Sequence, residues 1–241
     1  MPRIAFVAAL EREVLPLVRI WKARIVEHEG KRYRLFEDGN AVLACGGIGA
    51  ECARRATEVV IQDFHPDRVI SVGFAGALDG TAKVGDVIEP RVVVNATDGS
   101  RAETDSGKAI LVSVSEVVSR EQKARLRESY RASAVDMEAS AVALGAQARG
   151  VAFGALKAVS DEASFNITVT QRFVANGHFQ SGRFAVYVAV RPWLWKWAIT
   201  LARNSFKASK ALCAAIVEYT NRATLQPGPN LTSMGSMDRR P

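Results

Sequence analysis

The sequence has few of the residues that build disulfide-bonded or metal-binding proteins. It contains three cysteines and three histidines in 241 residues. Cys45, Cys52 and Cys213 are odd in number and show no framework spacing, so we interpret them as buried thiols in a reducing compartment. The histidines are scattered through segments of different character, which argues against a metal site and against a Ser-His-Asp triad. We therefore expect neither a metal nor a cofactor.

Long apolar runs are also missing. The N-terminal apolar run is too short, and too soon followed by charge, for a signal peptide. No stretch reaches the roughly 18 uncharged apolar residues of a membrane-spanning helix, so we expect a cytoplasmic protein. The net charge of +7 is compatible with an anionic ligand, nucleic acid or a membrane surface and does not choose among them. Nothing beyond that charge favours nucleic-acid recognition, so we expect no nucleic-acid partner.

Short apolar runs alternate with helical segments along the chain. Ile4–Ala9, Arg68–Val72 and Val151–Ser160 are nearly uninterrupted apolar runs, which is typical of strands buried on both faces. We predict an α/β fold: a single domain over residues 1–222 with a central mixed, mostly parallel, twisted sheet flanked by helices. Residues 226–241 are rich in Pro, Gly and Ser, a composition that predicts a disordered tail.

The remaining elements follow from periodicity and turn signals. The helices, strands and loop that we expect are these: helices over Glu11–Trp21, Ala50–Asp63, Glu121–Tyr130 and Glu138–Arg149; a hairpin of Tyr33–Glu37 and Ala41–Cys45; strands over Val87–Val94 and Ile110–Val114; and a surface loop over Asn95–Lys108.

Three carboxylates follow three of these strands. Glu13 lies just past the first strand, Glu138 begins an Ala-rich helix, and Asp161 closes the last strand. Glu13 and Glu138, like Asp136, are also explained as acids that stabilise a first helical turn or cap it. If the strands share one sheet, however, the three carboxylates converge on the edge where open α/β sheets bind ligands. Paired carboxylates can serve as acid and base, and cleavage of a glycosidic bond is one chemistry that fits.

Two glycine-rich turns each follow an expected strand. The turn Gly46–Gly49 could cradle phosphate, but it lacks the six-residue dinucleotide fingerprint and the Lys-Ser/Thr of a P-loop, so tight packing of the next helix is favoured. In Gly73–Gly76, glycines at a strand end allow backbone N–H groups to approach a ligand closely.

Several motifs together resemble the nucleoside phosphorylase/nucleosidase superfamily. Their order and combination are more specific than any one of them, and the resemblance covers roughly residues 3 to 165. It is closest to the methylthioadenosine/S-adenosylhomocysteine nucleosidase branch, which implies an enzyme that releases adenine from a 5′-substituted adenosine. The motifs are IAFVAALEREV, GGIGAECA, SVGFAGALDGTAKVGDVIEP, VDMEASAVA and LKAVSDEA.

The resemblance also implies a role for each matching residue. Met137 packs under the ribose, and Glu138 accepts hydrogen bonds from its 2′- and 3′-hydroxyls. Asp161 protonates N7 of adenine as the base departs, and Glu13 activates the attacking water. The other implied pocket residues include four departures: Lys157 replaces a frequent Arg, Phe74 replaces a Ser near the water, and valines stand where an aromatic lid is usual. These pocket residues are Phe74, Ala75, Gly76, Val117, Val118, Lys157 and Ser160.

Phosphorolysis is the alternative to hydrolysis in this superfamily. Hexameric purine phosphorylases carry an N-terminal Gly-Asp-Pro-x-Arg loop and a second Arg before the Asp of the strand-turn motif, both for phosphate. This chain has neither, and Gly85 stands before Asp86. A phosphate nucleophile would lack obvious neutralising partners, so we favour water. A third hypothesis is a non-catalytic nucleoside-binding protein on the same fold.

The C-terminal part fits the nucleosidases poorly. Residues 191–220 predict an amphipathic helix with Pro192 near its first turn, basic residues on one face and apolar residues on another. It is either a docking helix with a solvated basic face or an interfacial helix that brings residues 191–210 to a membrane, since Trp, Lys and Arg suit the headgroup level. A similar Arg-Pro-Trp helix occurs in the hopanoid-associated branch, which implies adenosylhopane, a lipid-linked nucleoside, as substrate. The resemblance further implies a homo-oligomer, such as a dimer.

Overall fold

One large mixed sheet organises the molecule, and its strands alternate side chains between two cores. The computed structural model describes residues 2–225, and the predicted disordered tail lies outside them. In β1 (Ile4–Ala8), Ala5 and Val7 face one core while Ile4, Phe6 and Ala8 face the other. This period of two, with every residue apolar, is what a strand buried on both faces requires.

Eleven strands form this sheet among the described residues. Parallel pairs join β1 to β4 and β5, and β5 to β11, whereas hairpins such as β2–β3 and β7–β8 are antiparallel. The mixed α/β fold is therefore confirmed. The strands other than β1 are β2 (Lys22–His28), β3 (Lys31–Asp38), β4 (Ala41–Cys45), β5 (Arg68–Ala77), β6 (Val87–Ile88), β7 (Pro90–Asn95), β8 (Arg101–Glu103), β9 (Ala109–Ser113), β10 (Ala134–Asp136) and β11 (Ala152–Asp161), with a separate pair β12 (Val174–Ala175) and β13 (His178–Phe179).

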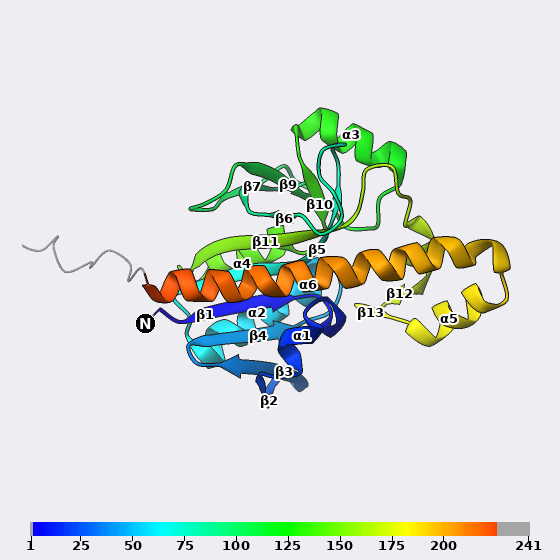
Figure 1. The fold of residues 1–241 in the computed structure, drawn as a ribbon. Helices are drawn as coiled ribbons and strands as arrows, with labels where there is room; N and C mark the ends of the chain where they lie inside the picture. The colour runs from blue at the N-terminus through cyan, green and yellow to red at the C-terminus, as the bar shows by residue number, and fades with distance from the viewer. Residues whose placement is uncertain (1, 226–241) are drawn as a thin grey trace, which may run out of the picture.

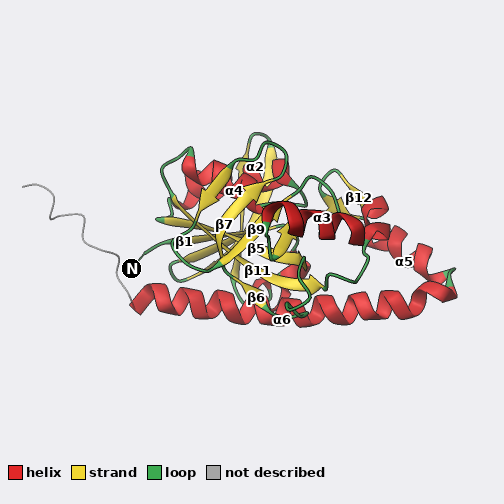
Figure 2. Ribbon diagram, turned by 90° about the horizontal axis from the view of Figure 1, so that it is seen from above, coloured by secondary structure: helices red, strands yellow, loops and turns green. Residues whose placement is uncertain are grey.

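Helices cover both faces of the sheet. Figure 2 shows α2 (Ala50–Phe64) and α4 (Ala139–Gln147) on one side and α6 (Trp195–Leu225) along the other. The C-terminal half of α6 buries Ala208, Leu212 and Ile216 against β1, β4 and β11. This confirms the predicted long C-terminal helix and its apolar face. No helix in residues 2–225, α6 included, is long and apolar enough to span a membrane.

The N-terminal half of α6 lies beyond the sheet. There it runs beside α5 (Ser181–Ala189), and the two project together from the body of the molecule (Figure 1). A short 3-10 turn, Pro192–Leu194, joins them, so the predicted helix from residue 191 begins as this turn and becomes α-helical at Trp195. We call residues 181–206 the α5–α6 hairpin.

Three local expectations were wrong in extent, and one strand was missed. The predicted helix Glu11–Trp21 is a 3-10 turn, Glu11–Glu13, followed by the single turn α1 (Leu15–Val18). Pro16 explains the break, because it has no N–H and its ring disfavours a helix continuing from the residues before it. The strand expected over Val87–Val94 is divided into β6 and β7, the expected loop after it contains β8, and the exposed edge strand β2 was not foreseen.

The other elements lie close to where periodicity placed them. The hairpin β3–β4 and helix α2 are confirmed, as is α3 (Arg120–Tyr130). Ser119 caps α3, since its hydroxyl accepts a hydrogen bond from the backbone N–H of Gln122 at 3.2 Å. Another 3-10 segment, Thr168–Phe173, follows β11 and leads to the α5–α6 hairpin.

Candidate active site

A cavity of about 380 Å³ lies where several strands of the sheet end. The turn after β1, the ends of β5, β10 and β11, and the N-terminal half of α6 contribute to its wall. Apart from Lys157, every site residue expected from the sequence lines it. These are Glu13, Phe74, Ala75, Gly76, Val117, Val118, Met137, Glu138, Ser160 and Asp161.

Glu13 reaches the cavity from the 3-10 turn that follows β1. It is 7% exposed, and its Oε2 accepts a hydrogen bond from the backbone N–H of Leu10 at 3.3 Å. Burial raises the pKa of Glu13 above its ordinary value, although the Lys157 and Arg12 cations oppose this. Gly73 makes room for the carboxylate, because a Cβ there would lie 3.1 Å from Glu13 Oε2 on a backbone with φ of +147°. A carboxylate with a raised pKa is suited to accept a proton near neutral pH.

Lys157 lies behind the cavity wall and does not line it, which corrects its expected place in the substrate pocket. Its side chain is 1% exposed, and its Nζ forms an ion pair with Asp136 Oδ2 at 2.9 Å. Burial lowers the pKa of Lys157, but the surrounding carboxylates, Asp136 first, outweigh this and raise it above the ordinary value. Lys157 thus holds a fixed positive charge among Glu13, Asp136 and Glu138.

Asp136 is the helix cap that the sequence suggested. Its Oδ2 accepts a hydrogen bond from the backbone N–H of Ala139 at 2.8 Å, at the start of α4, and its Oδ1 accepts one from Ser113 Oγ at 2.6 Å. Together with the Lys157 ion pair, these contacts commit both of its oxygens to structure. Capping therefore explains Asp136 and leaves Glu138 free for another role.

Glu138 points away from its own helix. No side-chain capping bond is formed; its Oε1 instead accepts a hydrogen bond from the backbone N–H of Gly49 at 2.9 Å. Burial raises the pKa of Glu138 to about 7, with Lys157 opposing the shift and Asp136 adding to it. The neighbouring turn is tightly packed, since a Cβ on Gly46 would meet Ala56 Cβ at 2.6 Å. Packing therefore accounts for the glycine of this turn at position 46.

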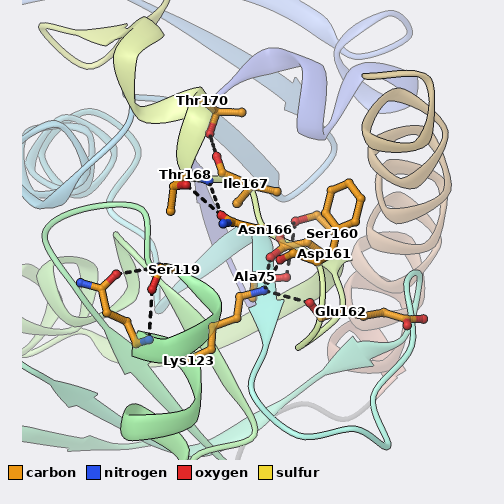
Figure 3. Close-up of polar contacts among 12 residues, drawn as sticks. Ala75, Ser119, Lys123, Ser160, Asp161, Glu162, Asn166, Ile167, Thr168 and Thr170 are labelled. Carbon is orange, nitrogen blue, oxygen red and sulfur yellow. Dashed lines mark hydrogen bonds and ion pairs between the residues drawn. The ribbon is translucent and has the colours of Figure 1, made fainter. Parts of the chain in front are cut away.

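Asp161 is held by a lysine that the sequence did not single out. Ser160 Oγ donates to Asp161 Oδ1 at 2.7 Å, and Lys123 Nζ lies 2.5 Å from Asp161 Oδ2 (Figure 3). Lys123 comes from α3 and lies 38 positions earlier in the chain. No local signal marked it, because its helix reads as a charged surface helix.

One side of the cavity is apolar and comes partly from the C-terminal helix, which the sequence predicted as either a docking helix or an interfacial helix. Leu201 and Ala202 of α6 line it together with Phe184 of α5 and Phe179 of β13. Phe184 packs edge-on against Trp197, with ring centroids 6.2 Å apart. The α5–α6 hairpin therefore contributes to the site itself, in addition to packing beside it.

Arg12 is a second cation on the lining that the sequence reading did not consider. Its guanidinium lies 4.4 Å from the centroid of the Phe179 ring, a cation–π contact. Burial lowers the pKa of Arg12, partly offset by Glu13. Glu13, Glu138 and Asp161 thus share one cavity with Arg12 and Lys123, an arrangement that can take a proton at one point and hold polar hydroxyls at another.

Comparison with known proteins places this site in a family. The model of the Phosphorylase superfamily matches residues 3–117 and 96–181, more than half of the chain. The chain belongs to the phosphorylase superfamily. This confirms the resemblance found in the motifs, and the match includes the segments that carry Glu13, Glu138 and Asp161.

Curated proteins similar in sequence to this chain include nucleosidases. A 5′-methylthioadenosine/S-adenosylhomocysteine nucleosidase of Staphylococcus aureus (strain JH9) is 28% identical over 192 residues, which cover 66% of this chain and 82% of the relative. The enzyme of the same name from Staphylococcus saprophyticus is 34% identical over 96 residues, 40% of each chain.

Solved structures share the fold. The 5′-methylthioadenosine/S-adenosylhomocysteine nucleosidase of Neisseria meningitidis, in complex with methylthio-immucillin-A, has a TM-score of 0.69 at 23% identity and covers 92% of this chain and 100% of its own. A futalosine hydrolase mutant of Helicobacter pylori has a TM-score of 0.59 at 22% identity, covering 68% and 89%. At these identities the likeness establishes the fold alone.

Proposed function

We propose that the protein is a purine nucleosidase that hydrolyses the N-glycosidic bond of a 5′-substituted adenosine and releases adenine. The observation that carries the proposal is the meeting of Glu13, Glu138 and Asp161 in one cavity of a phosphorylase-superfamily fold. The curated nucleosidase relatives support the same reaction class.

In this proposal each carboxylate has one task. Glu138 accepts hydrogen bonds from the ribose hydroxyls, and Met137 packs under the sugar. As the C1′–N9 bond breaks, its electron pair stays with adenine, which takes a proton at N7 by way of Asp161. Water adds its hydroxyl to C1′ of the oxocarbenium-like sugar and gives its proton to Glu13. The raised pKa of Glu13 supports its role as the proton acceptor.

The test is adenine release from methylthioadenosine, S-adenosylhomocysteine, adenosine and adenosylhopane. We expect turnover in phosphate-free buffer, with Glu13→Gln and Asp161→Asn each lowering it by about 100-fold or more, as for loss of general acid or base catalysis. Binding of these nucleosides without any turnover would instead support a non-catalytic nucleoside-binding protein. Full activity in both variants would overturn the assigned roles.

Phosphorolysis is the second candidate, and Arg12 is the observation in its favour. It lines the cavity as a guanidinium, the group best suited to phosphate. Its position over the Phe179 ring and the pairing of Lys123 with Asp161 favour water, since both lining cations already have partners. A requirement for phosphate, with ribose 1-phosphate derivatives as products, would support phosphorolysis and contradict hydrolysis.

In this proposal the apolar side of the cavity contacts the 5′ substituent of the substrate. Phe179, Phe184 and Leu201 provide hydrocarbon surface on that side of the cavity, and Arg12 lies over the Phe179 ring. Burial of an apolar group there is favourable by about 25 cal/mol per Å². We therefore favour an apolar substituent, with lipid-linked adenosylhopane as the leading substrate and the small thioether nucleosides as the alternative.

The outer surface of the α5–α6 hairpin supports peripheral membrane contact. Its exposed apolar side chains include Trp193, 74% exposed, and Trp195, 51% exposed, beside Lys196 and Arg203. Aromatic and basic side chains of this kind suit the headgroup region. The hairpin would then present the apolar wall of the cavity to the source of a lipid-linked substrate.

Flotation with vesicles of phosphatidylglycerol and phosphatidylcholine tests this contact. We expect the wild-type protein to float with the vesicles and Trp193→Ser/Trp195→Ser to stay in the soluble fraction. Ile20→Ser is the control, because Ile20 is 77% exposed but lies outside the hairpin. Failure of the wild type to bind would contradict membrane contact.

Assembly as a dimer stays a prediction. Light scattering after gel filtration measures the mass of the assembly and tests it.

A further inference from the structure

Lys123 is the one buried residue of an otherwise charged surface helix. Most side chains of α3 are polar or charged; Leu126 and Tyr130 are half-buried against an apolar cluster, and Lys123 alone is buried, at 1% exposed. Removing an ammonium from water is costly unless anions and hydrogen-bond acceptors replace the water. A helix that buries its lysine more deeply than Leu126 and Tyr130 therefore indicates a specific use for that charge.

The lysine is fully satisfied by the end of β11 and the segment after it. Its Nζ lies 2.5 Å from Asp161 Oδ2 and 3.0 Å from the carbonyl oxygen of Glu162 (Figure 3). The carbonyl oxygen of Phe165 is 3.3 Å from the same Nζ. Three N–H donors thus meet three acceptors. The second oxygen of Asp161 accepts from Ser160, so both carboxylate oxygens of Asp161 accept hydrogen bonds from neighbouring side chains.

A carboxylate poses a problem for the proposed reaction, because the departing adenine needs a proton. We propose that Lys123 is the proton reservoir of the site: its ammonium gives a proton to Asp161 as Asp161 gives one to N7. The inference rests on the proposed function and adds to it the source of the proton. Because Lys123 acts through Asp161, it is a positioning residue, whereas Asp161 contacts the base.

The proton balance closes over one turnover. One N–H bond of Lys123 breaks, Asp161 takes that proton and passes one to N7, and the electrons of the C1′–N9 bond remain on adenine. Lys123 is left as a neutral amine, and Glu13 holds the proton released by water. After the products leave, solvent carries a proton from Glu13 to Lys123, so both groups return to their starting forms.

Space around the pair fits this exchange. Lys123 lines the active-site cavity and also a second cavity of about 610 Å³ on the other side, which gives solvent an approach from α3. The other charged groups that line this second cavity are Arg120, Arg127 and Glu128 of α3 and Arg131, which follows α3. On the β11 side the Glu162 carboxylate pairs with Lys83 at 3.8 Å.

Gly76 makes room for the pair on the side of β5. A Cβ at this position would lie 2.9 Å from Asp161 Oδ2 and 3.3 Å from Lys123 Nζ, so any larger residue would displace one of the two. The strand end that the sequence marked as a place for ligand approach is therefore needed as well to accommodate an ion pair.

The experiment compares Lys123→Met with Lys123→Arg in the full-length protein. Arginine keeps the positive charge and the ion pair but cannot release a proton in the working pH range. We expect both variants to lose at least about 100-fold in kcat for the best adenine nucleoside, with KM changed less than about threefold. Arg125→Met, an exposed substitution on the same helix, should leave both constants unchanged.

A second substrate separates chemistry from folding. p-Nitrophenyl riboside has a leaving group that departs without a proton, so we expect both Lys123 variants to hydrolyse it within about fivefold of the wild type. Recovery of adenine release in Lys123→Arg would mean that only the charge matters and would overturn the inference. Loss of both substrates in both variants would also overturn it. Absence of wild-type adenine release would overturn the proposed function, and this inference with it.

Discussion

Replacing Glu138 by Gln should stabilise the unliganded protein, and more so at high pH. Burial raises the pKa of Glu138 from an ordinary 4.5 to about 7. The folded protein therefore favours the protonated form of Glu138. The stability that this form contributes is fully present below the unfolded pKa and is lost as the pH rises through about 7. At pH 8 the wild type must therefore keep an unfavourable charge that Gln does not carry.

The magnitude follows from the pKa. At about 1.4 kcal/mol for each pH unit, the shift corresponds to roughly 3 kcal/mol of destabilisation at pH 8. Glu138 is only half-buried, because it faces the cavity, so solvent reduces this to about 1 to 2 kcal/mol. The Gly49 hydrogen bond survives, since Gln also offers an oxygen acceptor.

Urea unfolding of wild type and Glu138→Gln at pH 5 and pH 8 measures the effect. We expect a small difference in unfolding free energy at pH 5 that grows by about 1 to 2 kcal/mol at pH 8. Glu51→Gln is the control: Glu51 pairs with Arg54 and Arg55, which lower its pKa to about 2, so its titration lies outside this range. An equal difference for Glu138→Gln at both pH values would refute the reasoning.

Three further predictions concern the site and the core. The acid limb of the kcat/KM profile should lie above the ordinary glutamate pKa, because burial raises that of Glu13 and the base must be ionised to accept a proton; Glu13→Gln should leave only low, pH-insensitive activity. Leu201→Trp should fill the apolar side of the cavity, raising KM for substrates with large 5′ groups more than for adenosine itself. Leu212→Ala, which truncates a fully buried side chain of α6, should lower the unfolding free energy by about 2 to 5 kcal/mol in denaturant titrations.

Local sequence patterns indicated much of the fold and the acidic residues of the candidate site. The apolar runs that became β1, β5 and β11 indicated strands, and the acids at their ends indicated a ligand edge. Pro16 and the exposed strand β2 show the limit of this reasoning. Periodicity detects a buried face, but β2 alternates only between exposed and half-buried residues, so its signal is weak.

The partners of the acids were decided by tertiary structure alone. Asp161 and Lys123 are 38 positions apart, and their contact exists because α3 docks against the end of β11. Leu201 is a second example: it lines the cavity together with residues that follow β1, because α6 packs beside that part of the sheet. Sequence specifies side chains and local backbone preferences, which act between near neighbours. Which buried charge meets which counter-charge depends on how whole elements pack, and that is a property of the folded chain.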